Sequence, residues 1–177
     1  AAFLASSLAF VAPKNPKAPI TLAVQSDKSR VDFIGSKAAD FHTGTFAVKG
    51  GSVQVEGGKL VGGSFVIDLA NLKVTDAAGE RLAGHLKSAD FFDVAKFGEA
   101  TYTISSVDYS SATACTINGT LNIKGVGVPV SFASNIRSAS EKGLFGQAFF
   151  SLDRTLLGIA YAGPSKDVQI AVHLFAK

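Results

Sequence analysis

The sequence predicts an all-β fold, in which an antiparallel eight-stranded barrel carries one short helical insert. Polar and apolar residues alternate in one segment after another, as in strands with a single buried face. Paired glycines and short polar turns separate most of these segments, and such turns favour hairpins between neighbouring strands. The chain also has 14 phenylalanines but no tryptophan or methionine, and phenylalanine is enriched in strands.

The expected strands share this alternation and follow one another closely along the chain. They cover residues 20–25, 29–37, 43–49, 52–56, 59–69, 100–109, 113–123, 128–137, 144–153 and 167–175. The glycine pairs at 50–51 and 57–58 are interpreted as turns. A sheet of about eight strands is expected to curl, and closure into a barrel removes its exposed edges. A two-sheet sandwich is the alternative.

One segment, residues 76–92, breaks the alternation. Thr75 or Asp76 could cap a short amphipathic helix over residues 76–87, and residues 89–92 are expected to form a second helical turn. Two adjacent phenylalanines, Phe91 and Phe92, follow this helix and lie between carboxylates. We interpret the insert as a cover over one end of the barrel.

The composition indicates a single domain and excludes several classes of protein. The chain has 177 residues, and its 17 basic and 14 acidic residues leave a net charge of +3. Because these charges are interleaved rather than gathered in a stripe, we expect no binding of nucleic acid. Cys115 is the only cysteine, which excludes an internal disulfide and a multi-cysteine zinc site. Its neighbours in the alternation are apolar, so we interpret it as a small buried side chain.

Residues 1–19 differ in kind from the barrel domain expected over residues 20–177. Residues 1–12 are apolar and rich in small side chains, and residues 13–19 contain three prolines and two lysines. This pattern is typical of the latter part of a secretory signal peptide followed by a stiff linker. We therefore expect a periplasmic or secreted protein. A short membrane-surface tail or a disordered tail is the alternative.

Four segments together resemble the YceI family of exported, lipocalin-like bacterial proteins. They are Phe-His-Thr-Gly-Thr-Phe at 41–46, Gly-His-Leu-Lys-Ser-Ala-Asp-Phe-Phe-Asp at 84–93, Asn-Gly-Thr-Leu-Asn-Ile-Lys-Gly-Val at 118–126, and Leu-Asp-Arg-Thr with the following Gly-Ile at 152–159. The resemblance runs from about residue 29 to residue 175. It implies a lipocalin-like barrel with a helical insert, whose interior binds a polyisoprenoid chain such as a quinone or a prenyl phosphate.

The barrel interior is the expected binding site, because an eight-stranded barrel has room for its own side chains or for one slender ligand. Small inward residues among large ones would leave a channel, and these are Gly63, Gly119, Gly146 and Ala148. The alternative is that the glycines are bends in a filled barrel. The residues expected to line or cap the channel are Phe33, Phe65, Phe91, Phe92, Ile104, Leu121, Phe132 and Phe150.

Two histidines and one arginine are the main polar candidates. His42 and His85 could bind a metal or act as acid–base groups, but no paired ligand spacing such as His-x-x-x-His is present, and we interpret both as structural. Arg154 either forms an ion pair with Asp153 or clamps a loop, or else it binds a phosphate or quinone oxygen of the ligand. The sequence leaves both alternatives for Arg154 open. Lys87 is a weaker candidate for binding the head group.

Together these features predict a carrier or store for an isoprenoid lipid, with no chemistry and no resident cofactor or metal. The sequence has no serine-nucleophile elbow and no phosphate-binding loop, so we expect no enzyme. Two alternatives remain: a filled barrel acting as an envelope stress or structural module, and a weak hydrolase or isomerase using His42 or His85 with Asp153. Transient contact with a membrane surface and formation of a homodimer are further expectations.

Overall fold

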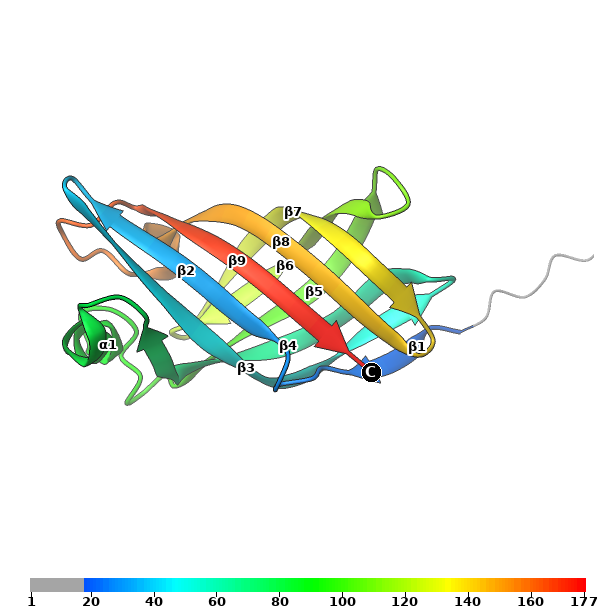
Figure 1. The fold of residues 1–177 in the computed structure, drawn as a ribbon, viewed down its shortest axis with the longest axis horizontal. Coiled ribbons are helices and arrows are strands. Elements are labelled where there is room, and N and C mark those ends of the chain that lie inside the picture. The colour runs from blue at the N-terminus through cyan, green and yellow to red at the C-terminus, as the bar shows by residue number, and fades with distance from the viewer. Residues whose placement is uncertain (1–17) are drawn as a thin grey trace, which may run out of the picture.

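The computed structural model describes residues 18–177, so nearly all of the predicted signal-peptide remnant and linker, residues 1–19, lies outside the described residues. Nine strands and two short helices follow one another along this part of the chain (Figure 1). In order they are β1 (Ile20–Ala23), β2 (Arg30–Lys37), β3 (Asp40–Glu56), β4 (Lys59–Val74), α1 (Gly79–Lys87), β5 (Glu99–Tyr109), β6 (Ala114–Ile123), β7 (Val126–Ser140), β8 (Gly143–Asp153), the 3-10 helix η1 (Arg154–Leu157) and β9 (Asp167–Ala176). Neither helix of this part has the length and apolar character needed to cross a membrane.

Strands β2 to β9 close into an antiparallel barrel, as the alternation predicts. They pair in the order β2–β9–β8–β7–β6–β5–β4, and β3 joins β4 to β2 to complete the ring. The short β1 pairs with the far half of β3, where Ile20 lies opposite Val55, while β2 pairs with the near half. Strands β1 and β2 therefore share one place in the ring, with a break at residues 25–29. The eight-stranded barrel is confirmed, and a sandwich is excluded because the ring is closed.

Strand β3 corrects one prediction, because the two strands expected at 43–49 and 52–56 form a single long strand. Its register against β4 shifts just before Gly50, so the glycine pair forms an irregularity within the strand rather than a turn. Gly51 has a φ of 135°, and a Cβ on this residue would lie 2.2 Å from the carbonyl oxygen of Ser64. Only glycine fits where two backbones approach so closely. Such an irregularity lets the long strand bend around the barrel.

Side chains fill the interior at the end of the barrel away from the insert. Val53, Leu60 and Leu144 are 0%, 2% and 3% exposed there. Cys115 on β6 is also buried, as expected, and burial raises the pKa of its thiol. Free space in the barrel is therefore found towards the insert.

Three glycines that were expected to leave a channel instead make room for their neighbours, so that prediction is wrong. A Cβ on Gly63 would lie 2.4 Å from a carbonyl oxygen of β3, and one on Gly146 would lie 3.2 Å from an isoleucine of β7. A Cβ on Gly119 would lie 2.6 Å from the ring of Tyr102. Ala148 is itself buried in the core. Close packing against backbone and rings, rather than open space, explains these small residues.

The insert between β4 and β5 lies at the opposite end of the barrel from the C-terminus, together with the loop between β8 and β9 (Figure 1). Helix α1 begins at Gly79, three residues later than predicted, and no side chain caps it. Asp76 instead accepts hydrogen bonds from the backbone N–H groups of Thr43 and Ala78, both at 2.8 Å. This carboxylate therefore ties the insert to β3. The segment after α1, expected as a second helical turn, forms irregular turns.

Candidate functional site

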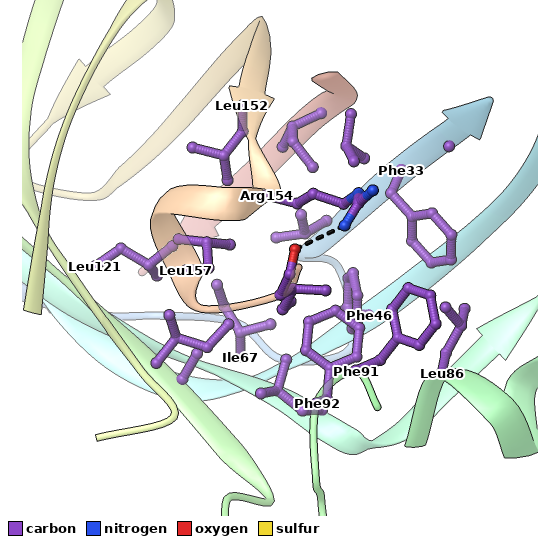
Figure 2. A pocket seen from close by; sticks show the side chains of 18 of the residues that line it. Phe33, Phe46, Ile67, Leu86, Phe91, Phe92, Leu121, Leu152, Arg154 and Leu157 are labelled. Atoms are coloured by element: carbon purple, nitrogen blue, oxygen red, sulfur yellow. Dashed lines mark hydrogen bonds between the residues drawn. The ribbon is translucent and has the colours of Figure 1, made fainter. Parts of the chain in front are cut away.

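A cavity of about 220 Å³ occupies the insert end of the barrel. All eight strands of the ring contribute inward side chains to its lining, and α1, η1 and the two loops beside them cover it. Most of the lining is apolar. Ser36 and Lys37, at the end of β2, are the exposed polar members of the lining and mark its rim. Figure 2 shows Phe91 and Phe92 of the insert lying opposite Arg154 and Leu157 across this space.

A row of four aromatic rings closes the bottom of the cavity, and we call it the aromatic floor. The row consists of Phe65, Tyr102, Phe132 and Phe150, from four different strands. Neighbouring ring centroids are 5.8, 5.4 and 4.4 Å apart in that order, and the last pair is stacked. Aromatic pairs at these distances stabilise each other beyond the area that they bury. The floor is therefore a connected unit rather than four independent side chains.

Tyr102 is the polar member of the aromatic floor. Its hydroxyl donates a hydrogen bond of 2.9 Å to the backbone oxygen of Val130. Burial disfavours the phenolate and raises the pKa of Tyr102 to about 12. The ring is therefore neutral and fixed in place, so that the floor presents an apolar surface to anything in the cavity.

A second group of rings lines the wall beside β2 and β3. Phe33 and Phe46 have centroids 5.1 Å apart, and Phe92 of the insert meets Phe46 edge-on at 5.6 Å. The insert thus contributes directly to the cavity wall, in addition to covering it (Figure 2).

Three more rings join the insert to the loop between β8 and β9. His85, Phe91 and Tyr161 lie with each pair of ring centroids 5.0 Å apart. Lys124, in the turn between β6 and β7, donates a hydrogen bond to the backbone oxygen of Phe91. Three loops therefore meet over Phe91, which is only 7% exposed. The insert covers this end of the barrel, as its sequence suggested.

Arg154 clamps the loop between β8 and β9, which settles one of the alternatives that the sequence left open. Its Nε donates to the backbone oxygen of Ser165 at 2.9 Å and its Nη1 to that of Ile159 at 2.6 Å. Its Nη2 donates to the oxygens of Tyr161 and Pro164, each at 2.8 Å. Four of the five guanidinium hydrogens are used in this way, and one on Nη1 is left.

The ion pair between Arg154 and Asp153, one of the alternatives from the sequence, is not formed. Asp153 instead accepts hydrogen bonds from the backbone N–H and the hydroxyl of Thr155, and it pairs with Lys166 at 3.3 Å. These contacts, the two from Thr155 foremost, hold the pKa of Asp153 below its usual value. The carboxylate caps η1, while the neighbouring arginine points into the barrel.

The two histidines serve different contacts. Nδ1 of His42 lies 3.3 Å from both carboxylate oxygens of Asp76, at the rim of the cavity. The pKa of Asp76 is lowered chiefly by hydrogen bonds from Ala78 and Thr43, with a further contribution from His42. His85 packs against rings, as described above. Neither histidine is hydrogen bonded to Asp153 within residues 18–177, so the acid–base pairing considered from the sequence is not assembled.

No group of three or more His, Cys, Asp or Glu side chains that could hold a metal occurs in the part of the chain that the structure describes. Apart from Tyr102 in the floor and the buried Arg154, the polar side chains of the cavity lie towards its opening. The arrangement offers an apolar interior with a polar opening, which suits an amphipathic ligand.

Most of the side chains predicted to line the barrel lie around the cavity. They are Phe33, Phe65, Phe91, Phe92, Leu121, Phe132, Phe150 and Arg154. Their contact with a ligand remains a prediction. Ile104 is a correction, because it lies in the packed core and not in the lining. Ile104 pairs with Gly119 on the neighbouring strand. The ring of Tyr102 lies across this glycine and therefore separates Ile104 from the cavity. Lys87 is also outside the lining.

Several lining residues were missed from the sequence. Tyr102 lies on the inward face of β5 together with Ile104, and Phe46 lies on the inward face of β3 together with Val48, so the alternation itself could have identified them. Leu157 and Ile159 line the cavity from η1 and the loop after it. They carried no such signal, because their segment has no strand periodicity.

No curated protein matches the sequence. Among solved structures, BcnA of Burkholderia cenocepacia superposes with a TM-score of 0.74 at 19% identity, over 87% of this chain and 99% of that one. A polyisoprenoid binding domain from Saccharophagus degradans gives 0.68 at 17% identity, over 88% and 97%. The YceI protein of Campylobacter jejuni gives 0.54 at 13% identity, over 99% and 94%.

At these identities the solved structures establish a shared fold. The family model of the YceI-like domain matches residues 22–176, which includes every strand of the closed ring and the insert. The match also contains all four segments that resemble this family in sequence. The chain therefore belongs to the YceI-like family.

Proposed function

We propose that this protein binds an isoprenoid lipid inside its barrel and carries or stores it without changing it chemically. The observation that carries the proposal is the apolar cavity with a polar rim, bounded by the aromatic floor and the insert. Membership of the YceI-like family and the likeness to a polyisoprenoid binding domain support the same ligand class. A completely filled barrel, the structural alternative, does not account for this cavity.

The expected affinity follows from the apolar lining. Each buried methylene contributes roughly 0.8 kcal/mol, so a tail of ten carbons could gain about 8 kcal/mol. That is about the binding free energy of a micromolar complex. Ordering the tail and fixing it in the barrel reduce this gain. We therefore expect micromolar affinity only for tails that fill the cavity.

The head group is expected to stay at the rim. Ser36 and Lys37 offer a hydroxyl and an ammonium group there, and His42 and Ser165 lie nearby in the lining. The remaining Nη1 hydrogen of Arg154 is a further donor. Such donors suit an oxygen-rich head, such as the carbonyls of a quinone or a prenyl phosphate.

Blocking the cavity tests this proposal. Ala100 is buried and lines the cavity, so Ala100→Phe would place a ring where the tail is expected. The next residue, Thr101, faces the outer side of β5, and Thr101→Phe is the matched control. We expect farnesol binding to weaken at least about tenfold in the first variant and by less than about twofold in the second. Equal binding by both variants, each shown to be folded by circular dichroism, would contradict the proposal.

Delivery of a lipid requires contact with the membrane that supplies or receives it, and we propose that the insert end makes this contact. Phe41, beside the cavity residue His42 at the start of β3, and Leu156, in η1 over the cavity, are 61% and 59% exposed. Apolar side chains of this kind can enter the interfacial region of a bilayer. The double variant Phe41→Ser, Leu156→Ser is expected to reduce sedimentation with phospholipid vesicles.

We also propose a periplasmic or secreted location, which fractionation of cells expressing the natural protein would test.

A further inference from the structure

We propose that Tyr102, lying across Gly119, sets the depth of the binding site and restricts the part of the tail held inside the barrel to about two or three isoprene units. This inference rests on the proposed function and makes it specific, because it assigns short-tailed isoprenoids as the ligands that fit completely. Longer tails would have to leave part of their length outside the barrel.

The position of the Tyr102 ring is fixed from both ends. Its hydroxyl is held by the backbone oxygen of Val130, and its ring contacts Phe65 on one side and Phe132 on the other. The ring reaches over β6 from β5 towards β7, and β6 carries Gly119 at this point. A Cβ on Gly119 would lie 2.4 Å from the backbone oxygen of Thr103 and 2.6 Å from both Cζ and Oη of the tyrosine. The glycine therefore permits this orientation of the ring, and any larger residue would displace it.

The interior does not continue as free space beneath the ring. Ile104 lies next along the inward face of β5 and is 8% exposed, without touching the cavity. Its cross-strand partners are Gly63 and Gly119, where neighbouring backbone and ring atoms already occupy the space. Val53, opposite Gly63, has no exposed surface. A tail that reaches the floor therefore has nowhere further to go.

The depth above the floor follows from the lining of β9. The part of β9 that lines the cavity begins at Val168 and ends at Val172, which is four residue steps along the strand. Four steps cover about 13 Å along a strand at roughly 3.3 Å each. Strands in such a barrel tilt by about 40°, which leaves about 10 Å along the axis. An isoprene unit adds four chain bonds of about 1.5 Å each and spans about 4.5 Å, so two units fill the depth and a third reaches the rim.

A series of prenyl alcohols with two to six isoprene units provides the test. Their binding to the full chain is measured by displacement of an environment-sensitive fluorescent probe. In the wild type, affinity is expected to rise by at least about tenfold per unit up to the third unit, after the cost of ordering the tail, and then to change by less than about twofold. In Tyr102→Ala the rise should continue for at least one more unit. Tyr102→Phe keeps the ring and should keep the wild-type limit.

A second variant covers the case in which Tyr102→Ala does not fold. Tyr102→Leu keeps an apolar side chain but removes the ring, and the limit is expected to move to a longer tail in this variant as well. Thermal unfolding followed by circular dichroism reports whether each variant is folded. Affinity that rises steadily through six units in the wild type would overturn the limit while leaving lipid binding intact. An unchanged limit in folded Tyr102→Ala would also overturn it. If the wild type bound none of the alcohols, the proposed function itself would fall, and this inference with it.

Discussion

Arg154 is expected to stabilise the folded protein through its hydrogen bonds to the loop between β8 and β9. Arg154→Met retains much of the apolar stem but removes the four hydrogen bonds to the loop between β8 and β9. The backbone oxygen of Ile159, a residue only 2% exposed, would then lie without a partner, whereas the oxygen of the more exposed Tyr161 can be hydrated. Bonds from a charged donor contribute about 1.5–3 kcal/mol each, but desolvation of the charge offsets much of their sum.

We therefore expect Arg154→Met to lower the free energy of unfolding by about 3 kcal/mol. For a domain of this size, the melting temperature should fall by about 6–12 °C. Urea unfolding measures the free energy, and hydrogen exchange should show faster exchange confined to the loop and η1. Arg154→Lys is the matched control, because a single ammonium group cannot reach four carbonyl oxygens and should recover only part of the loss. A loss below about 0.5 kcal/mol in Arg154→Met would refute the clamp.

The remaining predictions concern single titratable groups. Because the folded structure lowers the pKa of Asp76 below its usual 3.8, its contribution to stability is present above that pH and is lost as the pH falls further. Asp76→Asn should therefore melt earlier than the wild type at neutral pH, and this difference should shrink as the pH falls below 3.8; a constant difference would contradict this reasoning. Burial raises the pKa of the Cys115 thiol, so iodoacetamide should modify the folded protein at least about a hundredfold more slowly than the urea-unfolded chain. Equal rates would show that this thiol is accessible in the native state.

The alternation of residues was sufficient to predict the barrel, because one buried face per strand determines which residues point inward. Most of the strand residues expected at the cavity do lie in its lining, including Phe132 and Phe150, whose rings stack in the aromatic floor. The insert was recognised because it interrupts that alternation. These features depend on local sequence patterns, which a single chain displays directly.

The roles of the glycines could not be predicted, because they depend on contacts between distant segments. Gly51 lies in a single strand and not in a turn, since the backbone of β4 passes 2.2 Å from where its Cβ would be. Gly119 makes room for the ring of Tyr102, and no pattern within β6 indicates this. Sequence alone also left the role of Arg154 undecided, because the four carbonyl groups that it contacts belong to a loop without regular structure.

The central claim is that the tail of an isoprenoid lies inside the barrel above Tyr102. A crystal structure of the protein with a prenyl alcohol brominated at the tail end tests this directly, because anomalous scattering locates the bromine. We predict one bromine peak per chain between Phe33, Leu121 and Phe132. A peak only on the outer face of the barrel, for example beside the stacked rings of Phe145 and Phe175, would contradict the account.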